Sequence, residues 1–94
     1  MYNFSFSTKF KKDFKKIQKK SPKDVRSVVE LLDILREQGV DGIPAQMRPH
    51  KLKGEYLGDW ECHIKPDLLI IWFQIESPKE ITLIRIGSHS SLFR

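Results

Sequence analysis

All three histidines of this 94-residue chain lie in its second half, and each is surrounded by polar or charged residues. They are His50, His63 and His89. Imidazole gains and loses a proton near neutral pH, so histidines gathered with a carboxylate can accept and donate protons. This concentration of acid–base groups favours catalytic chemistry.

The segment from Trp60 to Lys65 carries one of these histidines and has the alternating pattern of a strand. Alternation puts Glu61, His63 and Lys65 on one face, with Asp67 just beyond the strand end. Such groups could hold a substrate or orient an imidazole. Ordinary solvent-exposed strands have the same pattern, so the pattern alone leaves both interpretations open.

The other two histidines are weaker candidates when taken singly. His50 ends a loop, where active-site groups and plain exposed histidines both occur. His89 and Phe93 are four residues apart, which places them on one side of a terminal helical turn that Ser88 could cap. Alternatively, Leu92 and Phe93 only anchor the tail to the core, and His89 has no role.

A zinc site is a further interpretation of the same residues. Three histidines and Asp67 would supply the three protein ligands of a catalytic zinc site. However, the chain has no close ligand pair such as His-x-x-x-His, so no metal or other cofactor is expected. The single Cys62 excludes an intrachain disulfide and is interpreted as a small core residue.

The net charge of +5 and the pI near 9.5 favour an acidic partner. The charge is concentrated near the N-terminus, where Asp13 is the only acid among seven lysines. This segment predicts a positive surface that attracts RNA, DNA, an anionic membrane or an acidic protein, and composition does not choose among them. The lysines are Lys9, Lys11, Lys12, Lys15, Lys16, Lys19 and Lys20.

The first third of the chain predicts a strand followed by two helices. Aromatic residues alternate with polar ones from Tyr2 to Phe6, and from Thr8 the apolar spacing becomes helical. Ser21 is the expected cap of a second helix, which Gly39 ends. The expected core-facing residues are Phe10, Phe14 and Ile17 in the first helix and Val25, Val28, Val29, Leu32 and Leu35 in the second.

The rest of the chain predicts strands at 51–53, 60–65, 68–75 and 80–86, with turns at Pro66-Asp67 and Ser77-Pro78. The segment 68–75 is apolar on both alternating faces, so it should be central in the sheet. We expect an α+β fold in a single domain, 1–94. It has an N-terminal strand, a hairpin of two helices, a largely antiparallel sheet of about four strands in total and a short C-terminal helical turn.

The longest apolar run, from Leu68 to Phe73, is too short to cross a bilayer. The first residues lack the charged start and apolar stretch of a secretory signal. We therefore expect a cytoplasmic protein that has no membrane partner.

Several short motifs occur in a distinctive order along these elements. They are His50-x-Leu52-x-Gly54, Gly58, Glu61-Cys62-His63-Ile64-x-Pro66-Asp67, Trp72, Arg85-x-Gly87-Ser88-His89 and Leu92-Phe93. Together they resemble the YafQ branch of the RelE-type bacterial toxins over nearly the whole chain. The combination is specific because three separate histidine motifs and the terminal Leu-Phe recur in order, whereas any one would be a weak match.

The resemblance implies a RelE-like fold and a ribosome-dependent mRNA endoribonuclease, the toxin of a type II toxin–antitoxin system. Such toxins cut mRNA in the ribosomal A site by attack of a ribose 2′-hydroxyl on the adjacent phosphate. The products are a 2′,3′-cyclic phosphate and a free 5′-hydroxyl, and no metal is required. The implied partners are a RelB/DinJ-like antitoxin, the ribosome with its mRNA and, only through the antitoxin complex, operator DNA.

Residue roles follow from matching positions in that family. His50 and His63, with Asp67, are expected to activate and position the 2′-hydroxyl, and His89 to transfer a proton to the leaving oxygen. The division between base and acid stays open.

Three more matching positions are expected to bind the substrate. Phe93 would stack on a base, Arg85 would stabilise phosphate charge and Glu61 would orient its neighbours. For Arg85, a surface ion pair is the alternative.

The seven lysines would bind ribosomal RNA through a surface remote from the histidines, and a merely solvated helix is the alternative. Two other classes of protein remain open. A noncatalytic nucleic-acid-binding module or co-repressor would need the basic helix but not the histidines. A zinc-dependent hydrolase would lose activity to a chelator and regain it with metal.

Overall fold

The computed structural model describes residues 1–93, which form one five-stranded sheet with helices on both faces. The sheet order is β1-β5-β4-β3-β2. The strands are β1 (Asn3–Phe6), β2 (His50–Lys51), β3 (Trp60–Lys65), β4 (Leu68–Glu76) and β5 (Lys79–Gly87), and the helices are α1 (Thr8–Lys20), α2 (Val25–Gln38) and α3 (His89–Leu92).

The α+β prediction is confirmed, including the central place of β4. Strand β1 pairs in parallel with β5, and the other strand pairs are antiparallel. The expected strand count of about four is wrong, because the two residues of β2 form a fifth strand on the edge of the sheet. The short strand expected at 51–53 corresponds to β2, which begins one residue earlier and which the count of about four left out.

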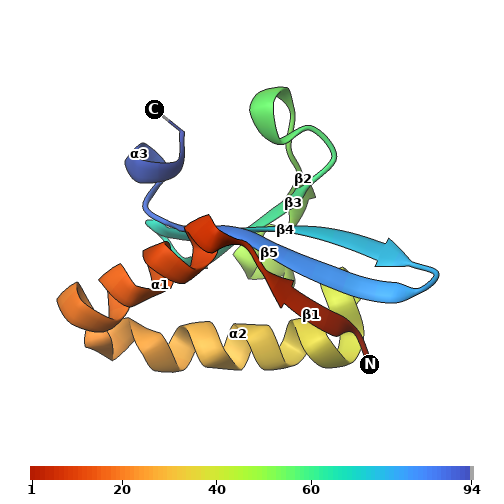
Figure 1. Cartoon of the computed structure of the whole chain (residues 1–94), viewed down its shortest axis with the longest axis horizontal. Helices are drawn as coiled ribbons and strands as arrows, with labels where there is room; N and C mark the ends of the chain where they lie inside the picture. The colour runs from red at the N-terminus through yellow and green to blue at the C-terminus, as the bar shows by residue number, and fades with distance from the viewer. Residues whose placement is uncertain (94) are drawn as a thin grey trace.

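The two faces of the sheet carry different layers. Figure 1 shows α1 and α2 below the sheet, and α3 and the loop after β2 above it. The main core lies between the sheet and the two long helices and is centred on Trp72, Leu31 and Leu35. A smaller cluster of Leu69, Ile71 and Leu92 lies under α3. The candidate site is on the α3 side.

Helix α2 differs from its predicted form in two ways. A 3₁₀ turn, Pro22–Asp24, precedes it, and within residues 1–93 the Ser21 side chain makes no capping bond. Val28 and Leu35 are buried as predicted, but Leu31 takes the core position expected of Val29, which is 45% exposed. The buried residues Val28, Leu31 and Leu35 follow helical spacing, and Val29 falls outside that buried stripe.

A register shift at the end of β3 corrects a second prediction. The pairing slips between His63 and Lys65, so that Lys65 lies opposite Leu68, a residue of the main core. The Lys65 ammonium binds Asp24 beside α2. Lys65 therefore does not share a face with His63, because a bulge interrupts the alternation.

Within residues 1–93, no helix has the length and apolar character needed to span a membrane.

Candidate active site

Four of the predicted site residues come to the α3 face of the sheet through strand register. His50 lies opposite Glu61, and Glu61 lies opposite Ile71, which in turn faces Arg85. Residues directly opposite in neighbouring strands share a face. His63 is two residues beyond Glu61 and so joins the same face. The sheet thus aligns groups from β2, β3 and β5 in one row.

His50 and Glu61 are in direct contact. The His50 Nε2 lies 3.2 Å from Glu61 Oε1, and its Nδ1 lies 2.8 Å from the Arg48 carbonyl oxygen. Glu61 is only 4% exposed, and within residues 1–93 its second carboxylate oxygen has no hydrogen-bond partner. Burying a carboxylate with an unpaired oxygen costs folding free energy. The same carboxylate orients the imidazole beside it.

His63 makes a looser contact, with its Nδ1 3.4 Å from the Pro66 carbonyl oxygen. It lines an open cavity of about 560 Å³ together with Met47, Arg48 and Lys65. Among residues 1–93, no hydrogen bond joins His63 to the other predicted catalytic side chains. The structure therefore brings His63 to the same face as His50 without a direct bond between them.

Asp67 anchors the start of α3. Its Oδ1 accepts a hydrogen bond from the His89 backbone N–H at 3.0 Å, across the sheet end. The Ser88 side chain accepts one from the Ser91 N–H, which confirms the predicted cap. The His89 and Phe93 rings are 5.0 Å apart, as the four-residue spacing indicates. Asp67 thus contacts His89 rather than His50 or His63.

Tyr56 is a residue of this face that sequence reasoning missed. It ends a 3₁₀ turn, Gly54–Tyr56, in the loop between β2 and β3, and its ring meets Phe93 edge-on at 5.9 Å. It packs against the cluster of Leu69, Ile71 and Leu92. An aromatic residue between Gly54 and Gly58 was the available signal, because a loop residue that is large and apolar needs a surface to cover.

Arg85 forms the ion pair named as the alternative to a substrate contact. Its Nε and Nη2 donate to the two oxygens of Asp13 at 2.7 and 3.0 Å. The two side chains are 19% and 12% exposed. The hydrogen bond with Asp13 raises the pKa of Arg85, so the guanidinium stays charged. Asp13, the lone acid of the basic helix, was also missed.

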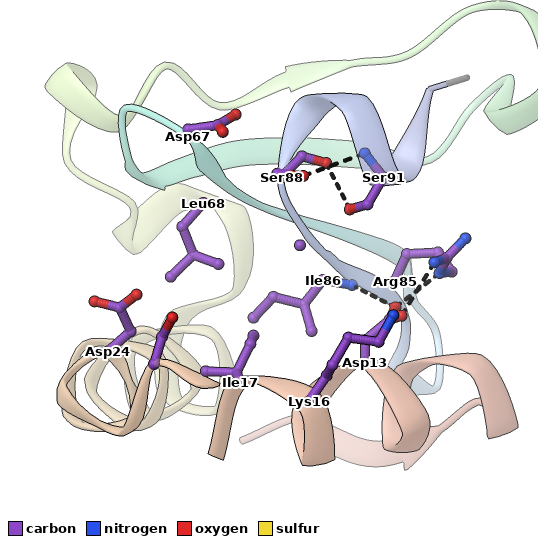
Figure 2. Close-up of a pocket in the computed structure, with 12 residues that line it drawn as sticks. Asp13, Lys16, Ile17, Asp24, Asp67, Leu68, Arg85, Ile86, Ser88 and Ser91 are labelled. Atoms are coloured by element: carbon purple, nitrogen blue, oxygen red, sulfur yellow. Dashed lines mark hydrogen bonds and ion pairs between the residues drawn. The ribbon is translucent and has the colours of Figure 1, made fainter. Parts of the chain in front are cut away.

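A cavity of about 470 Å³ lies between α1, the β3–β4 turn and α3. Figure 2 shows Asp67 and Ser88 on its upper wall, and Lys16 and the Asp13–Arg85 pair below. Lys16 therefore lines the same cavity as Asp67, which binds His89. Among residues 1–93, no histidine lines this cavity, so Lys16 shares it with Asp67 and Arg85 but not with the imidazoles.

All seven lysines of α1 are exposed, and within residues 1–93 none of them forms an ion pair. Three of them, Lys9, Lys12 and Lys16, surround Arg85 and Asp13 in a shallow cavity of about 310 Å³. The helix thus presents a positive surface that reaches the edge of the site.

Two further expectations concern metal and thiol chemistry. Within residues 1–93, no group of three or more His, Cys, Asp or Glu side chains is placed to hold a metal ion. Cys62 is a fully buried core residue, as predicted, and burial raises the pKa of its thiol to about 12.

Comparison with known proteins places this chain in a family. Residues 2–94 match the family described as "Bacterial toxin of type II toxin-antitoxin system, YafQ". The mRNA interferase toxin YafQ of Escherichia coli K12 is 29% identical over 91 residues, which are 97% of this chain and 95% of that protein.

Solved structures agree with this match. YafQ in a DinJ–YafQ complex from E. coli is 28% identical with a TM-score of 0.87, and all of both chains is covered. A metal-bound toxin from Helicobacter pylori is 32% identical with a TM-score of 0.85, over 99% of this chain and 100% of that one. This chain therefore belongs to the YafQ family of bacterial toxins of type II toxin–antitoxin systems.

Proposed function

We propose that this protein is a ribosome-dependent mRNA endoribonuclease, which inhibits translation by cutting mRNA in the ribosomal A site. The observation that carries the proposal is the convergence of His50, Glu61, His63 and Arg85 on one face of the sheet. The name of the E. coli relative, an mRNA interferase toxin, supports the same activity.

The proposed reaction is attack of a ribose 2′-hydroxyl on the adjacent phosphate. A base must take the hydroxyl proton and an acid must protonate the leaving 5′-oxygen. We assign His50, His63 and Asp67 to activating and positioning the 2′-hydroxyl and His89 to the leaving oxygen. Glu61 supports this assignment for His50, because its buried carboxylate lies 3.2 Å from the His50 Nε2.

The remaining site residues would bind the substrate. Positive charge must surround the phosphorane-like transition state, and the charged Arg85 guanidinium supplies it. Phe93, which lies beside the His89 ring, would stack on an unpaired base. Because the 2′-hydroxyl attacks the adjacent phosphate, the expected product is a 2′,3′-cyclic phosphate. Proton transfer between histidines and a hydroxyl needs no metal ion, so the reaction is expected to proceed without one.

Ribosome binding is assigned to the basic surface of α1. Seven exposed lysines around a single acid exceed what solubility requires, and a polyanion would bind them by releasing counterions. Lys16 lines the site cavity, so the same helix would connect ribosomal RNA to the mRNA at the site. The helix is thus proposed to deliver the site to its substrate.

A protein antitoxin is the proposed inhibitor. The E. coli family member is found in a complex with DinJ, and a RelB/DinJ-like acidic chain would be attracted to the +5 charge of this one. Operator DNA would be bound only by that complex. The protein is expected to act in the cytoplasm, where translating ribosomes are found.

The test is primer extension on a defined mRNA in a purified translation system, with and without ribosomes. The wild type should cut the mRNA only with ribosomes, and His89→Ala should not cut it at comparable enzyme concentration. Lys79→Ala, on the opposite end of β5, is a control that should cut like the wild type. Absence of cleavage by the wild type would favour the noncatalytic nucleic-acid-binding module.

A chelator distinguishes the zinc-hydrolase alternative. The enzyme is treated with excess EDTA before it is added to the ribosomes. Cleavage that persists after this treatment agrees with a metal-independent reaction. Cleavage that is lost after this treatment and returns with zinc would instead assign the histidines to a metal ion.

A further inference from the structure

Tyr56 contacts Phe93, the aromatic residue proposed to stack on a substrate base. Its ring meets the Phe93 ring edge-on, with centroids 5.9 Å apart and planes at 86°. Phe93 in turn lies beside His89, with centroids 5.0 Å apart. Edge-to-face contact is a favoured aromatic geometry, so the Tyr56 ring restricts the orientation of Phe93.

Tyr56 and Phe93 also rest on the same support. Both side chains pack against the smaller cluster of Leu69, Ile71 and Leu92. The cluster and the Tyr56 edge therefore contact Phe93 together, which leaves its ring less free to rotate than either contact alone would.

The loop that carries Tyr56 is closed on itself. The Leu52 N–H donates to the Asp59 carbonyl at 2.8 Å, and the Gly58 N–H donates to the Leu52 carbonyl at 3.2 Å. Gly54 and Gly58 take positive φ angles of 69° and 88°, which side-chain-bearing residues rarely adopt. A closed loop that ends beside the sheet holds Tyr56 at a fixed place.

We infer that Tyr56 is a positioning residue, whose ring sets the plane of Phe93 for base stacking. The inference rests on the proposed endoribonuclease function. Displacing the Phe93 ring by about 1 Å would lower the rate substantially, because reacting atoms must be held close to their productive geometry.

The test is the rate of mRNA cleavage on saturating ribosomes for two substitutions that separate ring from hydroxyl. Tyr56→Phe keeps the aromatic edge and should cut at about the wild-type rate, whereas Tyr56→Leu removes that edge and should lower kcat about tenfold to a hundredfold. KM for ribosomes should not change, since α1 lysines set that binding. Leu57→Ala, a neighbouring residue that is 76% exposed, is the matched control.

A double substitution separates positioning from general destabilisation. If the Tyr56 ring acts through Phe93, Tyr56→Leu should cost nothing further in a Phe93→Ala background. Independent, multiplying effects would overturn the inference, as would wild-type kcat in Tyr56→Leu or an equal loss of kcat in Tyr56→Phe. A wild type that cuts beside such variants leaves the proposed function standing and removes only the role of Tyr56. A wild type that does not cut removes both.

Discussion

Asp13 in α1 binds Arg85 in β5 through two hydrogen bonds, and the same carboxylate accepts the Ile86 backbone N–H at 3.1 Å. Strand β1 stops pairing with β5 at Leu83, so the edge of β5 is open from there on. Asp13 supplies the acceptor that a longer β1 would have supplied. A helix side chain therefore completes the sheet edge and holds the site arginine.

Asp13→Ala should destabilise the protein by about 2–3 kcal/mol, because it removes charge-assisted bonds from a largely buried arginine. Asp13→Asn should cost less, since its carbonyl oxygen still accepts one bond. The measurement is urea unfolding followed by circular dichroism. Lys11→Ala, on the exposed side of the same helix, is the control and should change the free energy of unfolding little. Equal stabilities for Asp13→Ala and the control would contradict the role given to Asp13.

Asp67→Ala should free the start of α3 while leaving the rest of the molecule folded. The His89 amide, which donates to Asp67, should then exchange its hydrogen much faster. Ser88→Ala is a matched variant, because Ser88 instead accepts from the Ser91 amide. Hydrogen exchange by NMR should show faster exchange at His89 in one variant and at Ser91 in the other. Unchanged exchange at His89 in Asp67→Ala would mean that this bond does not hold α3.

Glu61→Gln should separate stability from activity. The substitution removes a buried charge that has one partner, so the midpoint of urea unfolding should equal or exceed that of the wild type. Cleavage of mRNA should nevertheless slow, because an amide holds the His50 imidazole less strongly than a carboxylate. A lower midpoint would show that the carboxylate stabilises the fold and that its free oxygen is satisfied in solution.

Cys62 should react with iodoacetamide only when the protein unfolds. Its thiol is buried and has a pKa raised to about 12, so little thiolate exists at about pH 8. Mass spectrometry should find an unmodified native protein and a singly modified protein in guanidinium chloride. Rapid labelling of the native protein would mean that the sheet opens at β3 far more often than the packing indicates.

Tyr2 gives a pH dependence of stability at the other end of the sheet. Its hydroxyl donates to Glu76 at 2.7 Å, and this bond raises the pKa of Tyr2 to about 12. A raised pKa means that the unfolded chain loses this proton first, so the contribution to stability is complete below about pH 10 and is lost as the pH rises towards about 12. The stability difference between the wild type and Tyr2→Phe should therefore shrink over that range. A difference that stays constant would show that the bond is not formed.

The sequence predicted those parts of the fold that repeat along the chain. Strands β3, β4 and β5 follow from alternation, and α1 follows from the helical spacing of Phe10 and Phe14. Both patterns depend only on local backbone geometry, so the sequence alone predicts them. The buried stripe of α2 was predicted less well, because apolar residues occupy so many of its positions that helical spacing alone fits more than one stripe. The bulge that turns Lys65 towards Asp24 likewise has no periodic signature.

The site was predicted through histidines and motifs, whereas its supporting contacts come from tertiary structure. Asp13 is 72 residues from Arg85, and nothing in the spacing of a basic helix indicates that its one acid binds a distant arginine. Tyr56 was missed because a loop aromatic has no period to place it on a face. The contact between Asp67 and the His89 amide could not be predicted from the sequence either, because strand register decides which motifs come together.

The parallel pairing of β1 with β5 joins segments at opposite ends of the chain, with Phe6 opposite Leu83. Contacts between such distant segments form late in folding, after local helices and hairpins, because a long loop must close first. During synthesis, Asp13 has no Arg85 to bind and α3 has no place to dock until β5 has left the ribosome. A nascent chain that still lacks β5 therefore has no Asp13–Arg85 pair and no docked α3, so its candidate site is not yet assembled.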